Sequence, residues 1–162
     1  MSDRIKNIPK RKMKLIVKVR EQLEHRAMWL ALLSKEAAEK GLDAETFGRD
    51  ACFQCGCLQG EKLSKGSDSF KDLKKRLFGL GARWVFEMEM KSCSDDHLSI
   101  DFHYCPLVAA WQKMGLSDEE IARLCDTAMC GDRGIASKFG GVMQLGKVIS
   151  KGDPVCEVRF HK

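Results

Sequence analysis

The segment Asp101-Phe-His-Tyr-Cys-Pro106 holds the residues of this sequence that are best suited to chemistry. In a strand, successive side chains point to opposite faces, so Asp101, His103 and Cys105 would share one face. Pro106 would end the strand and begin a helix, and the N-terminus of a helix lowers the pKa of a neighbouring thiol. The pattern therefore predicts a nucleophilic Cys105 with His103 as its base. The alternative is that Cys105 is buried and inert, while Asp101 and His103 lie on a solvated strand edge.

Asp132 is a second candidate, because it stands in the sequence Gly-Asp-Arg-Gly134 within a helical pattern that begins near Ser117. The period of that pattern puts Asp132 on the same inward stripe as Cys125. A carboxylate on an inward face must be paired, hydrogen-bonded or catalytic, and its flanking glycines allow another backbone to approach closely. The alternative is that Asp132 lies past the end of the helix and pairs with Arg133 at the surface.

The cysteine cluster Cys52-x-x-Cys55-x-Cys57 has a spacing that is found among metal ligands. A structural zinc ion usually takes four ligands, and Cys93 or Cys130 would have to complete the set. The other interpretation is a reduced, loosely packed loop. The sequence therefore implies no cofactor firmly and leaves zinc as an alternative. Since the chain carries no secretory signal, its eight cysteines point to catalysis, metal binding or burial rather than to disulfides.

Positive charge is concentrated at the N-terminus. Residues 1–20 contain one acidic residue, Asp3, and eight basic ones: Arg4, Lys6, Lys10, Arg11, Lys12, Lys14, Lys18 and Arg20. We expect residues 1–11 to form a disordered, solvated leader. The weaker alternative is that the basic residues of 4–20 bind nucleic acid, although the remainder contains no nucleic-acid-binding module. No run of about 18 apolar residues occurs, which predicts a soluble, cytoplasmic protein without a membrane partner.

Hydrophobic periodicity predicts a single α+β domain over residues 12–162. The apolar alternation from Trp84 to Met90 is typical of a strand, and Ser117 with Glu120 forms a capping box that begins a helix. The predicted sheet is antiparallel, has about four strands, and packs with N-terminal and central helices. The predicted elements are helices over 12–40, 67–78, 106–114 and 117–137, a loop over 52–66, and strands over 83–91, 97–104, 142–149 and 155–161.

Five motifs together resemble the L-2-amino-thiazoline-4-carboxylic acid hydrolase family. They are Tyr-Cys-Pro-Leu-Val-Ala-Ala-Trp111, Gly-Leu-Ser-Asp-Glu-Glu-Ile121, Leu-Cys125-Asp, Gly-Asp132-Arg-Gly and Lys-Gly-Asp-Pro-Val-Cys156-Glu-Val-Arg-Phe160. The resemblance covers about residues 80–162, whereas residues 1–50 are similar only in being helical. The last motif is also similar to the 4-vinyl-reductase-like ligand-binding domains, and the cysteine cluster at 52–57 matches no family motif.

The resemblance implies hydrolysis of a small cyclic isothiourea, in which water adds to the ring C=N carbon and sulfur leaves. From residue types, we expect Asp132 to hold the protonated amidine and Cys105 with His103 to attack the carbon. Arg133 or Arg159 would bind the substrate carboxylate through paired hydrogen bonds.

Asp101 and Cys125 complete the predicted substrate site. The alternative function is non-catalytic: a protein that binds or senses a small molecule or a soft metal ion through its cysteines. The sequence leaves the oligomeric state open.

Overall fold

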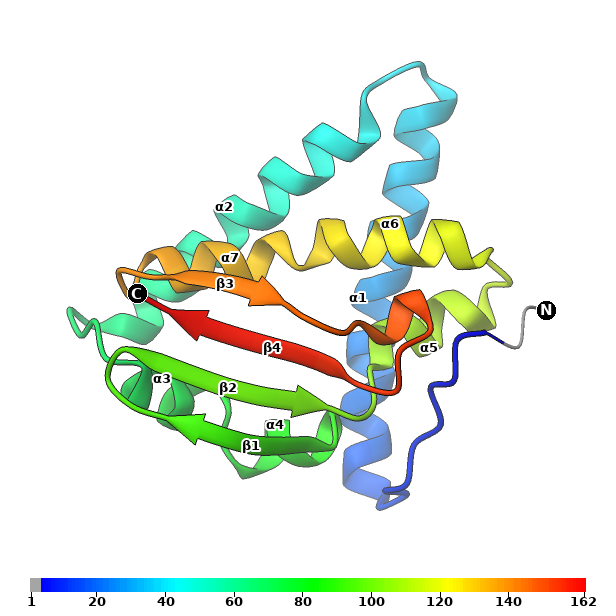
Figure 1. Cartoon of the computed structure of the whole chain (residues 1–162). Coiled ribbons are helices and arrows are strands. Elements are labelled where there is room, and N and C mark those ends of the chain that lie inside the picture. The colour runs from blue at the N-terminus through cyan, green and yellow to red at the C-terminus, as the bar shows by residue number, and fades with distance from the viewer. Residues whose placement is uncertain (1–3) are drawn as a thin grey trace.

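A computed structural model describes residues 4–162 of the chain as helices packed on a four-stranded antiparallel sheet with the strand order β1-β2-β4-β3 (Figure 1). The helices are α1 (Lys14–Glu39), α2 (Ala44–Ser64), α3 (Phe70–Leu77), α4 (Leu80–Val85), α5 (Pro106–Lys113), α6 (Asp118–Ala128) and α7 (Cys130–Ser137), with a 3-10 turn η1 (Ile149–Lys151). The strands are β1 (Met88–Cys93), β2 (His97–Phe102), β3 (Val142–Leu145) and β4 (Cys156–His161). The predicted α+β class and its antiparallel sheet are confirmed.

The two central strands supply the apolar face of the sheet. In the register of β2 with β4, Ile100 lies opposite Val158 and Phe102 lies opposite Cys156. Ile100 and Val158 are buried, and the helices lie behind this face in Figure 1. The alternate residues, such as Asp101, point to the polar face of the sheet. This alternation divides the sheet into a face that closes the core and a face that carries charge.

Helices α2 and α7 approach each other closely through glycine. A Cβ atom built on Gly56 would lie 1.9 Å from the carbonyl oxygen of Gly131, and one built on Gly134 would lie 2.2 Å from the carbonyl oxygen of Phe53. The flanking glycines of Asp132 were expected to allow another backbone to approach closely, and that backbone is α2. This contact holds Asp132 next to α2.

Two sequence predictions about secondary structure are wrong. The loop expected over 52–66 is part of α2, whose N-cap Asp43 accepts a hydrogen bond from the Thr46 amide at 3.1 Å. The glycines that suggested a loop serve helix packing, and tertiary contacts outweigh their low helix propensity. The strand expected over 83–91 divides into α4 and β1, since Glu87 between them has a left-handed φ of 51°.

Other predictions hold closely. The helix expected over 12–40 is α1, the helix after Pro106 is α5, and β1 with β2 forms the predicted hairpin. Both hydrogen bonds of the Ser117–Glu120 capping box are present at the start of α6. The helix expected over 117–137 is divided at Met129 into α6 and α7.

A buried ion pair anchors α1 to the junction of α4 and β1. Arg20 is 4% exposed, pairs with Glu87 at 3.0 Å, and donates to the Val85 carbonyl oxygen at 2.9 Å. Its guanidinium lies 4.3 Å from the ring centroid of Tyr104, which adds a cation–π contact. The pair compensates for the desolvation of both charges and accounts for the unusual backbone at Glu87.

The described part of the predicted leader packs against the domain instead of being loose. Ile5 is 5% exposed, and the Asn7 side chain both donates to the Cys105 carbonyl oxygen at 2.8 Å and accepts from the Cys105 amide at 2.9 Å. The Lys10 and Arg11 amides each donate to Glu87 at 2.7 Å. The remainder of that prediction, residues 1–3, lies outside the described residues. Within residues 4–162, no helix combines the length and apolarity needed to cross a membrane.

Candidate functional site

A cavity of about 410 Å³, which we call the interior cavity, lies between the apolar face of the sheet and helices α1, α2, α5, α6 and α7, and it opens to solvent beside the exposed residues Arg26 and Cys55. Its walls are mostly apolar, and Leu30, Phe86 and Trp111 are among them. The residues in it that could do chemistry are Arg26, Cys52, Cys55, Cys105, Cys125, Asp132 and Cys156. Five of the eight cysteines therefore share one enclosure with one acidic and one basic side chain.

Asp132 reaches the cavity from the first turn of α7, as the sequence predicted for an inward face. Within residues 4–162, its carboxylate has no hydrogen bond from another residue and is hydrogen-bonded only to its own backbone amide. Burial raises its pKa to about 6, and the positive charge of Arg26 opposes part of that shift. Asp132 is thus a carboxylate that can accept or release a proton near neutral pH.

Arg26 is the functional candidate that sequence reasoning missed. It is an exposed residue of α1 at the edge of the cavity, and its charge lowers the pKa of both Asp132 and Cys52 against the effect of burial. Its position carries a signal, since Arg26 stands three residues after Leu23 and four before Leu30, within the apolar stripe of α1. Because Arg26 is exposed, its guanidinium stays hydrated while it stands close enough to the cavity to reach a bound anion.

Cys105 is the N-cap of α5, and its thiolate would accept hydrogen bonds from the Leu107 and Val108 amides. The expected low pKa is nevertheless wrong, because burial raises the pKa of Cys105 to about 12. Desolvation of the thiolate outweighs the helix N-terminus. Cys105 is therefore a neutral thiol in the free protein at physiological pH.

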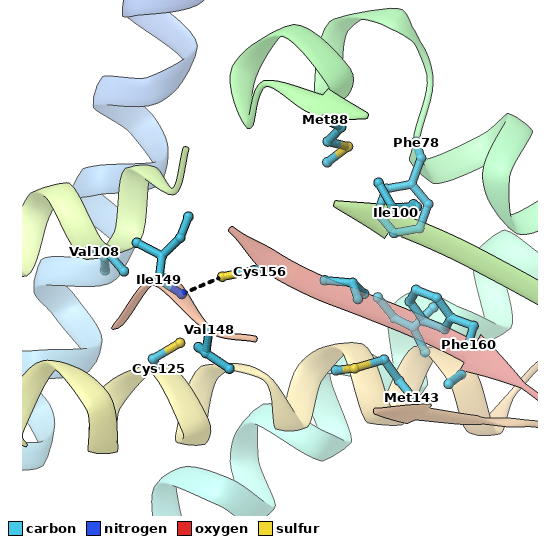
Figure 2. Close-up of a cluster of buried hydrophobic side chains, with 14 of the residues drawn as sticks. Phe78, Met88, Ile100, Val108, Cys125, Met143, Val148, Ile149, Cys156 and Phe160 are labelled. Atoms are coloured by element: carbon cyan, nitrogen blue, oxygen red, sulfur yellow. Dashed lines mark hydrogen bonds between the residues drawn. The ribbon is translucent and has the colours of Figure 1, made fainter. Parts of the chain in front are cut away.

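Cys125 and Cys156 lie near Cys105, at one end of the cavity. Burial raises the pKa of each thiol, and Cys105 contributes to the shift of Cys156. Figure 2 shows the Ile149 amide donating to the Cys156 sulfur, at 3.2 Å. Cys125 was predicted as part of the substrate site, and it does line the cavity.

The family comparison decides what kind of protein carries this cavity. The family model for L-2-amino-thiazoline-4-carboxylic acid hydrolase matches residues 20–160. The chain belongs to this family. No curated protein matches the chain. Its fold is similar to the crystal structure of a trafficking protein particle complex subunit 3 from Naegleria fowleri covalently bound to palmitic acid, with a TM-score of 0.57. That match covers 85% of this chain and 93% of the other at 16% identity, so it concerns the fold alone.

Two residues predicted for this hydrolase-family site lie outside the cavity lining. Strand β2 ends at Phe102, so its alternation does not continue to Cys105. His103 pairs with Glu89, with the Nε2 and Oε2 atoms 3.3 Å apart. Asp101 is on the polar face of the sheet. The expected contact of His103 with Cys105 is therefore not formed, because the chain leaves the strand between them.

The two arginines expected to bind a carboxylate are paired elsewhere. Arg159 forms an ion pair with Asp101 at 2.7 Å on the polar face of the sheet. Arg133 pairs with Asp126 at 3.2 Å and lines a separate cavity of about 340 Å³ beside α6 and β3. The ion pair of Arg133 with Asp126 takes the place of the alternative pairing with Asp132, and among the described residues Arg26 is the arginine that lines the interior cavity.

The predicted zinc ligands do not converge. Because α2 is a helix, Cys57 is rotated by roughly 200° from Cys55 about its axis. Cys52 and Cys55 face the cavity, whereas the Cys57 sulfur contacts the Ser137 hydroxyl at 3.8 Å. Among residues 4–162, no three His, Cys, Asp or Glu side chains are grouped so that they could hold a metal ion. The expected Cys52, Cys55 and Cys57 metal site is therefore wrong.

Proposed function

We propose that this member of the family hydrolyses a small cyclic isothiourea, such as L-2-amino-thiazoline-4-carboxylate, in the interior cavity. The observation that carries the proposal is Asp132, a buried carboxylate without a side-chain partner among the described residues, inside an enclosure of about 410 Å³. Enclosures of about 300–1,000 Å³ are typical of small-molecule sites. An amidinium ion would supply the two N–H donors and the positive charge that Asp132 lacks.

The charges of the cavity suit both ends of such a substrate. Asp132 would accept hydrogen bonds from the amidinium group, and Arg26 would bind the carboxylate. The mostly apolar walls reduce the local dielectric constant around Asp132, which strengthens its interaction with the amidinium group. Arg26 and Asp132 would therefore fix the orientation of the ring and present its C=N carbon to a bound water molecule.

The reaction then balances with Asp132 as the base. The water oxygen bonds to the ring carbon, and one water proton moves to Asp132. The resulting tetrahedral centre collapses: its hydroxyl becomes a carbonyl, the C–S bond breaks, and sulfur takes up a proton as a thiol. Starting from an amidinium ion, one further proton returns to solvent. Asp132 serves first as base and then as acid, a task suited to its pKa of about 6.

A competing mechanism would use Cys105 as the attacking group, with Asp132 taking its proton. The negative charge of Asp132 contributes to the raised pKa of Cys105, so these two groups interact. We favour water, because a thiol whose pKa is about 12 supplies very little thiolate at neutral pH. Cys105 would then shape the wall of the site.

The test is thiol release from L-2-amino-thiazoline-4-carboxylate by the purified, reduced protein. We expect Asp132→Asn to slow release by about 10²–10⁴-fold, which is the range of general acid–base catalysis. Arg26→Gln should raise KM more than it lowers kcat, and Cys105→Ser should retain most turnover. Asp68→Asn is the matched control, since Asp68 forms an exposed ion pair with Lys162 far from the cavity.

The outcomes separate the two mechanisms. Loss of turnover in Cys105→Ser with an intact fold would replace water by a cysteine nucleophile. No release by the unmodified protein would refute this substrate. Equal activity of the unmodified protein and Asp132→Asn would refute the assigned base.

A second candidate is non-catalytic binding of an apolar small molecule. It is favoured by the mostly apolar walls of the cavity and by the five thiols that face it. The solved structure of similar fold is covalently bound to palmitic acid, which is an apolar ligand of the kind this candidate function requires. Native mass spectrometry of the purified protein tests this candidate, since a retained ligand adds mass and Trp111→Ala, by opening the wall, would reduce its retention.

A further inference from the structure

A second hollow, open to solvent and of about 510 Å³, lies outside the interior cavity between α3, the start of α4 and β1. We call it the basic cavity, and four cations line it: Lys71, Lys74, Lys75 and Arg83. No acidic residue is among the described residues that line it. The three lysines stand at i, i+3 and i+4 on α3 and therefore project from one side of that helix.

Arg83 is the most informative of these residues. It comes from α4, so its presence beside the α3 lysines is a product of the tertiary fold. Its Nε atom is buried and has no hydrogen-bond acceptor, one of two such side-chain atoms in residues 4–162. A buried guanidinium donor without an acceptor is unfavourable, so a shift of the Arg83 side chain that lets Nε reach an acceptor in the hollow would be stabilising.

Helix electrostatics explain only part of this arrangement. Basic residues near the C-terminus of α3 complement the helix dipole, and Lys71 pairs with Asp95 at 2.7 Å. Within residues 4–162, Lys74, Lys75 and Arg83 take part in no ion pair. Three positive charges therefore face one hollow without counter-charge, and their mutual repulsion is relieved when an anion binds.

We propose that the basic cavity binds the phosphate group of a phosphate ester. Arginine binds phosphate through the edge of its guanidinium that carries Nε, and lysines add point charges around the remaining oxygens. The floor includes Phe78, which is 5% exposed, and Leu80, which is 59% exposed, so an apolar part of the ligand finds a contact surface beside the cations. The organic portion of an ester meets that description better than free phosphate does. This site is independent of the proposed hydrolase activity.

Calorimetry measures the binding of glycerol 3-phosphate to the protein. Flotation measures the binding of the protein to phosphatidylcholine vesicles, prepared with and without one quarter phosphatidylglycerol. The test variant is Lys74→Glu with Lys75→Glu. Its matched control, Lys12→Glu with Lys14→Glu, makes the same change in net charge on exposed residues near the start of α1. Arg83→Lys keeps the charge but removes the planar fork. Circular dichroism verifies that each variant is folded.

We expect one molecule of the soluble ester to bind per chain, and the Lys74/Lys75 variant to weaken binding by at least about tenfold. Arg83→Lys should also weaken it, and the control should not. The vesicles with phosphatidylglycerol could bind, with the same dependence on the variants, while the soluble ester does not. This result would support the site and assign its phosphate to a lipid headgroup. If both double variants weakened binding equally, binding would depend only on the net charge of the protein, and the proposal would be overturned. It would also be overturned if neither glycerol 3-phosphate nor the vesicles bound.

Discussion

The close approach of α2 to α7 makes Gly56 sensitive to the addition of a single methyl group. In Gly56→Ala the new Cβ atom would meet the carbonyl oxygen of Gly131 at 1.9 Å, about 1.5 Å short of the 3.4 Å at which ordinary contact begins. The obstacle is backbone, so no rotamer change relieves it. The two helices must move apart, and α7 carries Asp132 while α2 carries cavity cysteines.

The expected cost combines two opposing effects. Overpacking of a close interface costs typically 1–3 kcal/mol, and the upper part of that range applies when backbone must move, so we take about 3 kcal/mol. Helix propensity opposes this cost, because alanine stabilises a helix by up to about 1 kcal/mol relative to glycine. We therefore expect the free energy of unfolding to fall by about 2 kcal/mol. For a chain of this size, Tm would drop by about 4–8 °C.

The matched control is Gly81→Ala. Gly81 also lies inside a helix, α4, but a Cβ atom there would meet nothing within 4 Å. This variant should gain up to about 1 kcal/mol from helix propensity alone. Urea unfolding and thermal unfolding of both variants give the two changes, and thiol release reports whether Asp132 has moved. The reasoning would be refuted if Gly56→Ala were as stable as Gly81→Ala.

Three further predictions concern charge and hydrogen bonding. Glu87→Gln should lower the free energy of unfolding by about 3–5 kcal/mol in urea titrations, because it leaves Arg20 as an uncompensated buried cation; a loss below about 1 kcal/mol would show that the pair is solvated. Asn7→Ala should cost about 1–3 kcal/mol and speed alkylation of Cys105, because it removes both hydrogen bonds to the backbone of that residue; unchanged alkylation would contradict this. Since burial raises the pKa of Asp132 to about 6, the folded state binds a proton more tightly than the unfolded chain, and stability should fall as pH rises from about 4 to 7. In Asp132→Asn that fall should be reduced, while thiol release by the unmodified protein should increase as pH rises through about 6.

The correct sequence predictions rest on interactions between residues that are close in the chain. The capping box at Ser117 satisfies amides within one helical turn, and Pro106 fixes the start of α5 locally. The inward position of Asp132 also followed from helical period, because Met129 between α6 and α7 keeps a right-handed helical backbone, with φ −67° and ψ −12°. The antiparallel hairpin followed from two strands joined by a short turn.

The wrong predictions depended on distances that only the fold sets. Gly56 and Gly60 look like loop residues until α7 lies against them, since their lack of a side chain serves a partner more than 70 residues away. The pKa of Cys105 depended on how much water the fold leaves beside it, and burial outweighed the helix N-terminus. His103 lies outside the cavity lining because β2 ends at Phe102, the residue before it, whereas the strand was expected to continue to residue 104.

The sequence by itself determined the α+β class, the family and an inward carboxylate at Asp132, because periodicity, caps and motifs are read from neighbouring residues. The tertiary structure decided that Arg26, and neither Arg133 nor Arg159, shares the cavity with that carboxylate. It also brought Arg83 to the lysines of α3. Charges act through space and desolvation depends on enclosure, so the ionisation and pairing of these groups follow from packing between segments distant in the chain.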